Sequence, residues 1–315
     1  FLFSNQQIRA AYAAVHIAPN KRFLILSGLS GTGKTQMLLS FAESYVLASD
    51  LNPQEHIVKV SVSPDWRDPS PLLGYINPIF EQGNQKTYVN GEITQFLLRA
   101  ARYPLLPFFL ILDEMNLARV ERYFAPFLSG METPSQPLML HEDRGQPSGV
   151  PSQIDRWPCN LFIGGSVNMD ETTHAFSDKV LDRAFTMEYW HIDLERYLDE
   201  QQSSISSETR TILIGLYRSL VQAHCHFGYR TVNELLQFVE KAMQMEGSEI
   251  ERELLDQAIC AKILPKIRGQ YSTDLERALQ ESMRICSTHS LPISRSKLSQ
   301  MLHRLQEFGL TRFWS

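Results

Sequence analysis

Short apolar runs alternate with helical patterns over the first two-thirds of the chain. Near-continuous apolar runs are typical of strands that are covered on both faces, and their alternation with helices is typical of a parallel sheet. The sequence therefore predicts an α/β core in which helices flank a parallel sheet. The expected strands are residues 22–27, 57–62, 108–112, 161–163 and 185–189, and two of the expected helices are residues 35–48 and 178–183.

Two stretches rich in turn-forming residues interrupt this alternation. Residues 63–90 are rich in Pro, Gly and Asn, and residues 133–160 contain five prolines. Loops of this length inside a compact domain are usually functional. We therefore expect two loop or hairpin insertions, near 63–90 and 133–160, within an α/β core that spans residues 1–195.

The pattern changes to helices alone after about residue 192. Thr231 and Glu234 have the spacing of a capping box, and the apolar positions 232, 235, 236 and 239 then fall on one helix face. Residues 196–315 are therefore expected to form a helical lid domain, with the change of domain near 192–207. Further helices are expected at residues 208–224, 250–264, 272–286 and 294–307, between glycine and proline breaks.

Composition indicates the class of protein and its cellular compartment, and it does not change the expected fold. The 315 residues are 43% hydrophobic and 21% charged, which is ordinary for a water-soluble protein. No apolar run approaches the roughly 20 residues needed to span a bilayer, and four scattered cysteines suit a reducing compartment. We expect a cytoplasmic protein without membrane segments. Because the chain begins without methionine, we also expect it to be a fragment with a further N-terminal domain.

Charge is distributed unevenly along the chain. The net charge of -5 argues against a surface wholly devoted to nucleic acid. Residues 260–315, however, carry nine Lys and Arg residues against four Asp and Glu residues. This basic C-terminal part could meet DNA or an acidic neighbouring subunit, and a solvated helical face explains it equally well.

The strongest chemical signal is a complete phosphate-loop pattern, G-x-x-x-x-G-K-T, between the first expected strand and its helix. Backbone N–H groups of such a loop cradle phosphates, and the following helix adds its positive N-terminal end. The lysine reaches the β- and γ-phosphates and the threonine hydroxyl ligates Mg²⁺. The alternative is a glycine turn that binds nothing. The eight residues are Gly28, Leu29, Ser30, Gly31, Thr32, Gly33, Lys34 and Thr35.

Two carboxylates end the apolar strand at residues 108–112. Asp113 is placed to hold the Mg²⁺ shell beside Thr35. Because neighbouring residues at a strand end point in different directions, Glu114 can face the γ-phosphate and polarise water. A helix cap is the alternative for an isolated Asp-Glu pair, but the upstream phosphate loop favours the catalytic interpretation.

Two further polar residues follow the next strands. Asn168 ends the strand after residues 161–163, where an amide can orient the attacking water. Arg183 closes a short helix, where it could act on a neighbouring subunit's γ-phosphate as an arginine finger. The alternatives are a turn-forming Asn and a surface salt bridge from Arg183 to a local acid such as Asp178 or Asp182.

These segments together resemble the McrB-type branch of AAA+ nucleoside triphosphatases over roughly residues 4–270. The glycine loop and the Asp-Glu pair are shared with all AAA+ proteins, whereas the SDKVLDR string at 177–183 and the WRD insertion at 66–68 point to this branch. The segments that carry the resemblance are 28–35, LDEMN at 112–116, VNMD at 167–170, FSDKVLDR at 176–183, WRD at 66–68, LLGY at 72–75, GYR at 228–230 and ILPKIR at 263–268.

The resemblance implies a role for each matching position. Asn168 corresponds to the sensor-1 residue, Arg183 to the finger that acts in trans, and Arg230 to the sensor-2 arginine that couples the γ-phosphate to lid closure. It also implies a hexameric ring that uses GTP and Mg²⁺ and acts on DNA together with an McrC-like nuclease subunit. The chain itself contains no convincing nuclease constellation.

One segment departs from the family pattern. Residues 168–173 read NMDETT, where the family signature reads NTADRS. Asn168 is retained, whereas the arginine is missing, so the departure bears on the partner interface and on the guanine preference. ATP is therefore the second candidate nucleotide. The rival functions are a MoxR-like ATPase chaperone and a nucleotide-gated scaffold with negligible turnover.

Overall fold

The computed structural model describes residues 3–82, 85–141, 150–169, 173–200, 206–246 and 250–314. The contacts between residues divide the chain into two compact units. One unit contains residues 3–28 and 34–190, and we call it the sheet unit. The other contains residues 191–315 together with 29–33, and we call it the helical unit.

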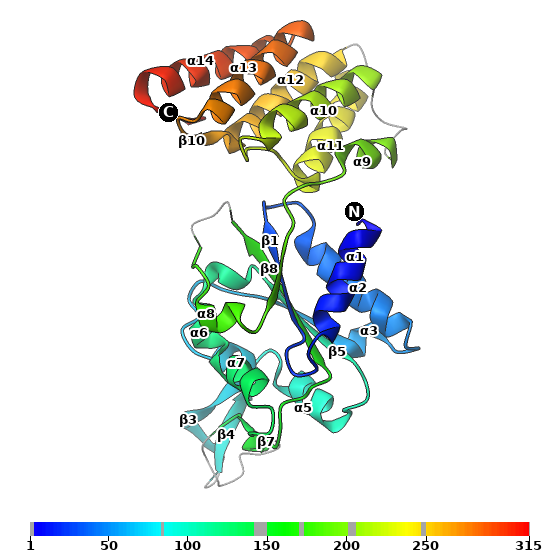
Figure 1. Ribbon diagram of the computed structural model, residues 1–315, viewed down its shortest axis with the longest axis vertical. Coiled ribbons are helices and arrows are strands. Elements are labelled where there is room, and N and C mark those ends of the chain that lie inside the picture. The colour runs from blue at the N-terminus through cyan, green and yellow to red at the C-terminus, as the bar shows by residue number, and fades with distance from the viewer. Residues whose placement is uncertain are drawn as a thin grey trace. The chain divides into compact units, whose positions relative to one another are not determined.

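A five-stranded sheet in the order β2-β5-β8-β1-β9 forms the centre of the sheet unit (Figure 1). Every neighbouring pair in it is parallel, so the prediction of an α/β core with a parallel sheet is confirmed. The strand order places β8 between β1 and β5, which decides which side chains can meet at the carboxyl edge. The strands are β1 (Phe23–Gly28), β2 (Ile57–Ser61), β5 (Phe108–Asp113), β8 (Leu161–Asn168) and β9 (Phe185–Glu188).

Alternate residues of β1 pack to opposite sides of the sheet. Leu24 and Leu26 join a buried cluster with α1 and α2, whereas Phe23 and Ile25 join a second cluster with α5, α6 and α7. A central strand buried on both faces reads as a continuous apolar run, which is the pattern that identified it. The helices and helical turns of this unit are α1 (Asn5–His16), α2 (Lys34–Leu47), α3 (Pro53–His56), α4 (Ser70–Leu73), α5 (Thr94–Arg102), η1 (Met115–Leu117), α6 (Val120–Tyr123), α7 (Ala125–Glu132) and α8 (Asp178–Leu181).

Each of the two expected insertions contains an antiparallel strand pair. The first is formed by β3 (Gly74–Gln82) and β4 (Gln85–Asn90), and the second by β6 (Leu138–Met139) and β7 (Gln153–Ile154). Residues 83–84 and 142–149 of these insertions lie outside the described residues.

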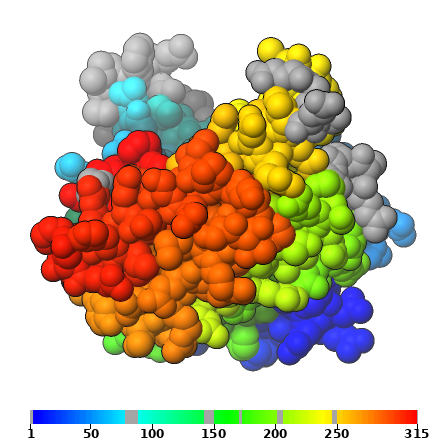
Figure 2. All heavy atoms as spheres, turned by 90° about the horizontal axis from the view of Figure 1, so that it is seen from above, coloured from blue at the N-terminus to red at the C-terminus, as the bar shows by residue number. Residues whose placement is uncertain are grey.

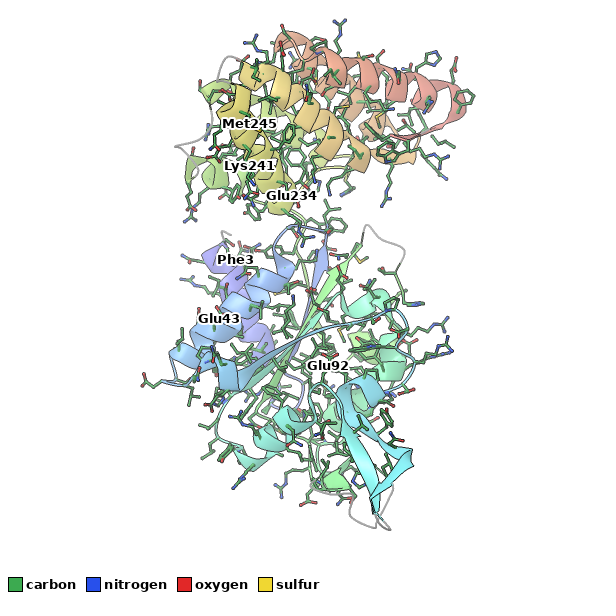
Figure 3. The ribbon with its side chains drawn as sticks, turned by 180° about the vertical axis from the view of Figure 1, so that it is seen from behind. Phe3, Glu43, Glu92, Glu234, Lys241 and Met245 are labelled. Carbon is green, nitrogen blue, oxygen red and sulfur yellow. The ribbon has the colours of Figure 1, made fainter. Side chains whose placement is uncertain are left out.

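The helical unit consists mainly of helices around one apolar cluster. The expectation of helices alone after residue 192 is wrong, because two short strands, β10 and β11, pair within this unit. On α11 the expected apolar positions 232, 235, 236 and 239 are all buried, while Glu234, Lys241 and Met245 lie along the same helix in Figure 3. Figure 2 shows α13 and α14, coloured orange to red, forming much of the face in view. The elements are α9 (Leu194–Glu200), α10 (Ser207–Val221), α11 (Tyr229–Glu246), α12 (Glu251–Lys262), η3 (Leu264–Lys266), β10 (Arg268–Gln270), α13 (Thr273–Thr288), α14 (Pro292–Phe308) and β11 (Leu310–Arg312).

The expected capping box at Thr231 is wrong, because α11 begins two residues earlier, at Tyr229. Thr231 is buried within the first turn. The Tyr229 ring is also buried, and its hydroxyl accepts a hydrogen bond from the Asp193 backbone N–H at 3.1 Å. Packing of Tyr229 therefore extends the helix beyond the point that local cap preferences indicate.

The start of α14 is fixed by a buried carboxylate from another helix. Asp256 on α12 accepts hydrogen bonds from the backbone N–H groups of Ile293 and Ser294, each at 2.8 Å. The first N–H groups of a helix have no partner within it, so Asp256 satisfies two of them and opposes the positive end of the helix dipole. None of the helices in the described part of the chain combines the length and the apolar character needed to cross a membrane.

Candidate functional site

The phosphate-loop residues join the end of β1 to the start of α2. Gly31 and Gly33 have φ angles of 80° and 94°, a backbone region that side chains other than glycine rarely adopt. The Thr32 hydroxyl donates to the Leu29 carbonyl at 2.9 Å, which closes the turn internally. The loop conformation thus depends on the glycines of the motif.

Lys34 is the first residue of α2, and its side chain is folded back across the loop. The residue is 5% exposed, and its Nζ donates to the Gly28 carbonyl at 3.0 Å. A buried ammonium needs negative charge or carbonyl oxygens around it. The fold therefore holds a fixed positive charge inside the turn where phosphate oxygens would be recognised.

Asp113, at the end of β5, is the centre of a hydrogen-bonded cluster. The Thr35 hydroxyl and the Ser166 hydroxyl both donate to its Oδ1, at 2.6 and 2.8 Å. Thr35 Oγ1 also lies 3.1 Å from Ser166 Oγ. Because β8 lies between β1 and β5, Ser166 of β8 reaches both residues and reinforces the direct bond between Thr35 and Asp113.

Lys59 of β2 supplies a charge to the same carboxylate. Its Nζ lies 2.8 Å from Asp113 Oδ2, and the two side chains are 43% and 21% exposed. Burial by itself raises the pKa of Asp113. Hydrogen bonds from Lys59, Thr35 and Ser166 outweigh that effect and hold the pKa below its ordinary value. Asp113 is therefore ionised at neutral pH and available as an anionic ligand.

The oxygen atoms beside the phosphate loop fit Mg²⁺. Thr35 Oγ1 and Asp113 Oδ1, 2.6 Å apart, are hydroxyl and carboxylate ligands of the kind that this ion prefers. Mg²⁺ at nucleotide sites takes few protein ligands and completes its shell with phosphate oxygens and water. Within the described ranges, no group of three or more His, Cys, Asp or Glu side chains is arranged to hold a metal.

Glu114 adopts a left-handed backbone conformation, with φ 54° and ψ 46°. Its backbone N–H donates to Ser166 Oγ at 3.0 Å, and its Oε1 accepts a hydrogen bond from Asn168 Nδ2 at 3.3 Å. A non-glycine residue in this region costs roughly 1–3 kcal/mol and persists only where its surroundings enforce it. The strained turn directs Glu114 away from Asp113 and toward the amide of Asn168.

Arg183 lies apart from this cluster within the sheet unit. Its guanidinium forms an ion pair with Glu132 at 2.5 Å and donates from Nε to the Leu128 carbonyl at 3.0 Å. The local acid is therefore Glu132 on α7, instead of Asp178 or Asp182. The Arg183 side chain is only 11% exposed.

Arg230 belongs to the helical unit and is the second residue of α11. Residues 29–33 group with this unit through their contacts, and the Arg230 backbone N–H donates to the Gly31 carbonyl at 3.3 Å. Position 228 requires glycine, because a Cβ there would lie 2.4 Å from the Gly31 carbonyl carbon. Of the segment 168–173, which differs from the family signature, residues 170–172 lie outside the described residues.

Two members of the Asp113 cluster, Ser166 and Lys59, were missed by the sequence analysis. Ser166 precedes Asn168 by two residues, and side chains two apart on a strand share a face. A serine within a buried apolar strand was the available signal. Lys59 is the single charge in its strand, but only the pairing of β2 with β5 places it beside Asp113.

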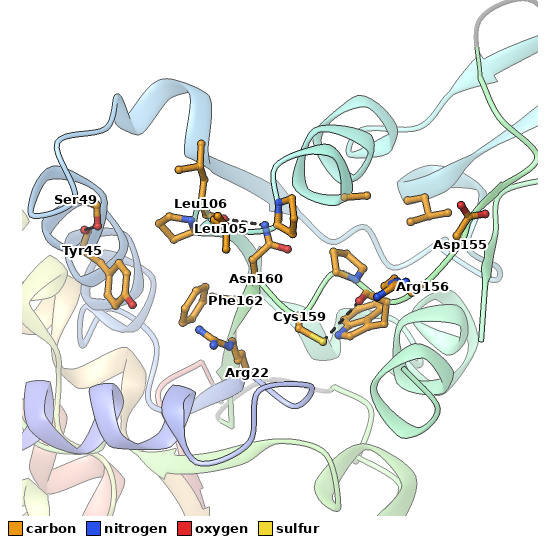
Figure 4. Close-up of a pocket in the computed structure, with 16 residues that line it drawn as sticks. Arg22, Tyr45, Ser49, Leu105, Leu106, Asp155, Arg156, Cys159, Asn160 and Phe162 are labelled. Carbon is orange, nitrogen blue, oxygen red and sulfur yellow. Dashed lines mark hydrogen bonds between the residues drawn. The ribbon is translucent and has the colours of Figure 1, made fainter. Parts of the chain in front are cut away.

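A separate cavity of about 800 Å³ lies in the sheet unit near the amino ends of β1, β5 and β8. Figure 4 shows Arg22, Phe162 and Asn160 around it, and the Arg22 guanidinium lies 4.4 Å from the Phe162 ring centroid. The phosphate loop, Asp113 and Asn168 are instead at the carboxyl ends, where parallel sheets bind their ligands. This cavity is therefore not part of the candidate nucleotide site.

Comparison with known proteins covers the C-terminal part of the chain. Residues 186–310 match a family described as a domain of unknown function (DUF8727). None of the curated proteins matches the sequence. The matched range includes most of the helical unit and does not include the phosphate loop or Asp113.

Replacing Ser166 with alanine is expected to destabilise the sheet unit. Ser166 is 3% exposed, and its removal leaves the Glu114 backbone N–H and Asp113 each short of one hydrogen-bond partner. Losing a buried partner costs about 1–3 kcal/mol. Urea denaturation should show this loss for Ser166→Ala, whereas Ser49→Ala, at an exposed position, should change the transition by less than about 0.5 kcal/mol. Equal effects of the two substitutions would contradict a structural role for Ser166.

Proposed function

We propose that this chain hydrolyses a nucleoside triphosphate with the help of Mg²⁺. The main support is the cluster in which Thr35, Asp113 and Ser166 are joined by hydrogen bonds of 2.6 and 2.8 Å at the end of a phosphate-loop pattern. A glycine turn that binds nothing has no need of an anionic carboxylate bonded to the hydroxyl that follows its lysine. The arrangement suits phosphoryl transfer, where catalysis is mostly positioning and charge stabilisation.

Each residue near the loop has a separate role in this proposal. Lys34 holds the β- and γ-phosphates, while Thr35 and Asp113 hold the metal ion. Mg²⁺ bound there would neutralise charge on the phosphates. Glu114 accepts a proton from the attacking water, and the Asn168 amide, which donates to Glu114 at 3.3 Å, orients that carboxylate and the water.

The wider function rests on the resemblance to McrB-type AAA+ proteins. On that basis, the chain is the motor of a hexameric ring that uses GTP to drive DNA restriction with an McrC-like nuclease subunit. Arg183 acts in trans as the finger, and Arg230 acts as the sensor-2 residue. A MoxR-like ATPase chaperone is the rival function, and it has no nuclease partner.

Side-by-side titration of GTP and ATP in a phosphate-release assay tests this function. We expect Mg²⁺-dependent turnover with a higher kcat/KM for GTP. A site whose polar groups pair with guanine rejects adenine because the mismatch strands buried donors and acceptors. A clear preference for ATP would favour the chaperone-like rival, and negligible turnover with intact binding would favour a nucleotide-gated scaffold.

Hydrolysis is expected to require a neighbouring subunit. If Arg183 acts in trans, specific activity rises with protein concentration, because rings must assemble before any finger meets a phosphate. Mixing Arg183→Ala with Lys34→Ala protomers should restore some activity, since some interfaces then combine an intact loop with an intact finger. Phosphate release, measured over a range of protein concentrations and mixing ratios, tests both the concentration dependence and the rescue.

Glu132→Gln is the matched control for the arginine. It weakens the ion pair that holds the guanidinium while leaving Arg183 in place. If Arg183 acts as a finger, Arg183→Ala should abolish turnover and Glu132→Gln should not. If Arg183 serves only in the local ion pair, the two variants should lose similar amounts of turnover. Activity that does not depend on concentration, with no rescue in the mixture, would rule out action in trans.

A further inference from the structure

The strands β10 and β11 form a short antiparallel ribbon in the helical unit, and its outer face carries two arginines. Arg268 and Arg312 are directly opposite each other in the register. Opposite residues of an antiparallel pair point to the same side. Thr311, between Leu310 and Arg312, is buried with its hydroxyl bonded to the Met301 carbonyl at 2.8 Å, so both neighbours of Thr311 point outward.

The two strands and the residues that flank them carry a net positive charge, although Glu276 of α13 lies close by and accepts a hydrogen bond from the Tyr271 hydroxyl at 2.9 Å. Residues 266–271 and 308–314 contain three Lys and Arg residues and no Asp or Glu. Lys297 of α14 lies near the Trp314 end of the ribbon, with its Nζ 4.4 Å from the centroid of the Phe313 ring, which packs against the core of the helical unit. Arg268 and Arg312 are both exposed, so the phosphate groups of a polyanion can reach the two guanidinium groups from the same side of the ribbon.

Exposed aromatic rings lie at both ends of the ribbon. Trp314 follows Arg312 and is 82% exposed, whereas Phe308 and Tyr271, at the other end, are 70% and 53% exposed. Tyr271 is held beside that end, because its backbone N–H donates to the Gly309 carbonyl at 2.7 Å. Guanidinium groups flanked by exposed rings are the combination with which proteins bind unpaired nucleotides, through phosphate contacts and base stacking.

We propose that the outer face of the β10–β11 ribbon, with Arg268 and Arg312, binds single-stranded nucleic acid together with the exposed rings at the ribbon's two ends (Phe308, Tyr271 and Trp314). An acidic peptide would use the charges and leave the rings in water. A duplex has its bases stacked internally, so it offers the rings no unpaired face. The proposal is independent of nucleotide hydrolysis, because none of these residues belongs to the phosphate loop.

Fluorescence anisotropy of the whole chain without nucleotide tests the proposal. The probes are labelled single-stranded DNA and RNA of about 12 nucleotides, a duplex of the same sequence and a poly-glutamate peptide. We expect binding to either single strand, weaker binding to the duplex and the peptide, and a steep loss of affinity with salt. Lys34→Ala should bind the single strands like the unmodified chain, which separates this surface from the nucleotide site.

Variants of the ribbon should separate charge from stacking. The pair Arg268→Ala with Arg312→Ala is expected to weaken binding about tenfold or more and to reduce the salt slope by about 1.4, because two phosphate contacts are lost. Replacing both arginines with lysine should restore the slope. Trp314→Ala should weaken binding roughly fivefold or more with the slope unchanged.

Arg252→Ala is the control, since Arg252 is exposed and ion-paired with Glu208. It should leave affinity and slope unchanged. Tighter binding of the duplex or of poly-glutamate would overturn the proposal. So would single-strand affinities that the ribbon substitutions leave unchanged, or that Arg252→Ala lowers equally.

Discussion

Nucleotide binding is expected to be lost when Lys34 is replaced with alanine. The Lys34 ammonium is buried within the loop and bonded to the Gly28 carbonyl at 3.0 Å. Charge-assisted hydrogen bonds contribute about 1.5–3 kcal/mol each, and Lys34 can donate to two phosphates. Losing about 3 kcal/mol weakens binding roughly a hundredfold. Isothermal titration calorimetry with GTP and ATP in the presence of Mg²⁺ measures this loss.

Two further variants make the result specific to the loop. Lys262→Ala removes an exposed lysine that pairs with Glu234 at 2.6 Å, so nucleotide affinity should not change. Lys34→Arg keeps the charge but presents a larger planar group, so some affinity should remain. Thermal unfolding shows whether each variant is folded. Unchanged affinity in a folded Lys34→Ala variant would remove the phosphate-loop assignment.

The central strands β1, β5 and β8 could be predicted because each is a near-continuous apolar run, and the edge strands β2 and β9 were also predicted although they are more exposed. A strand covered on both faces must be apolar at nearly every position, and β5 and β8 are buried along almost their whole length. The expectation of Asp113 at the end of β5, and of Lys34 and Thr35 at the start of the helix after β1, followed from the same pattern. Local sequence therefore sufficed for the strands of the sheet and for the ends at which chemistry was expected, but not for the strands β10 and β11 of the helical unit.

The contacts between elements could not be predicted in the same way. Ser166 contacts both Thr35 and Asp113 because β8 lies between β1 and β5, and strand order is a long-range property. Likewise, Arg183 pairs with Glu132 on another helix instead of with the acids beside it in sequence. Sequence reasoning considers only residues that are close along the chain, whereas these hydrogen-bond and ion-pair partners are brought together by the packing of distant elements.

The backbone at Glu114 is a second feature that no pattern indicated. Its left-handed conformation is rare for a residue with a side chain. Ser166 fixes it by accepting the Glu114 N–H at 3.0 Å, and Asn168 then meets the carboxylate at 3.3 Å. Strained residues held in this way cluster at functional sites. The sequence placed Glu114 at the strand end, but only the fold explains how it diverges from Asp113.

Replacing Glu114 with glutamine is expected to stop hydrolysis while preserving nucleotide binding. Glutamine keeps an Oε1 acceptor for the Asn168 amide and the same backbone, but it cannot accept a proton from water at neutral pH. General-base catalysis typically contributes 10²–10⁴-fold, so turnover should fall by about a hundredfold or more. Phosphate release measures turnover, and calorimetry should find GTP affinity close to that of the unmodified chain. Light scattering should also find that any rings that form with GTP persist longer, because their nucleotide is not consumed.

Glu92→Gln, at an exposed glutamate, is the matched control and should leave turnover unchanged. Glu114 precedes a short helical turn, and its side chain makes no cap hydrogen bond there. Near-normal turnover in Glu114→Gln would therefore exclude this carboxylate as the base and require another group to activate the water.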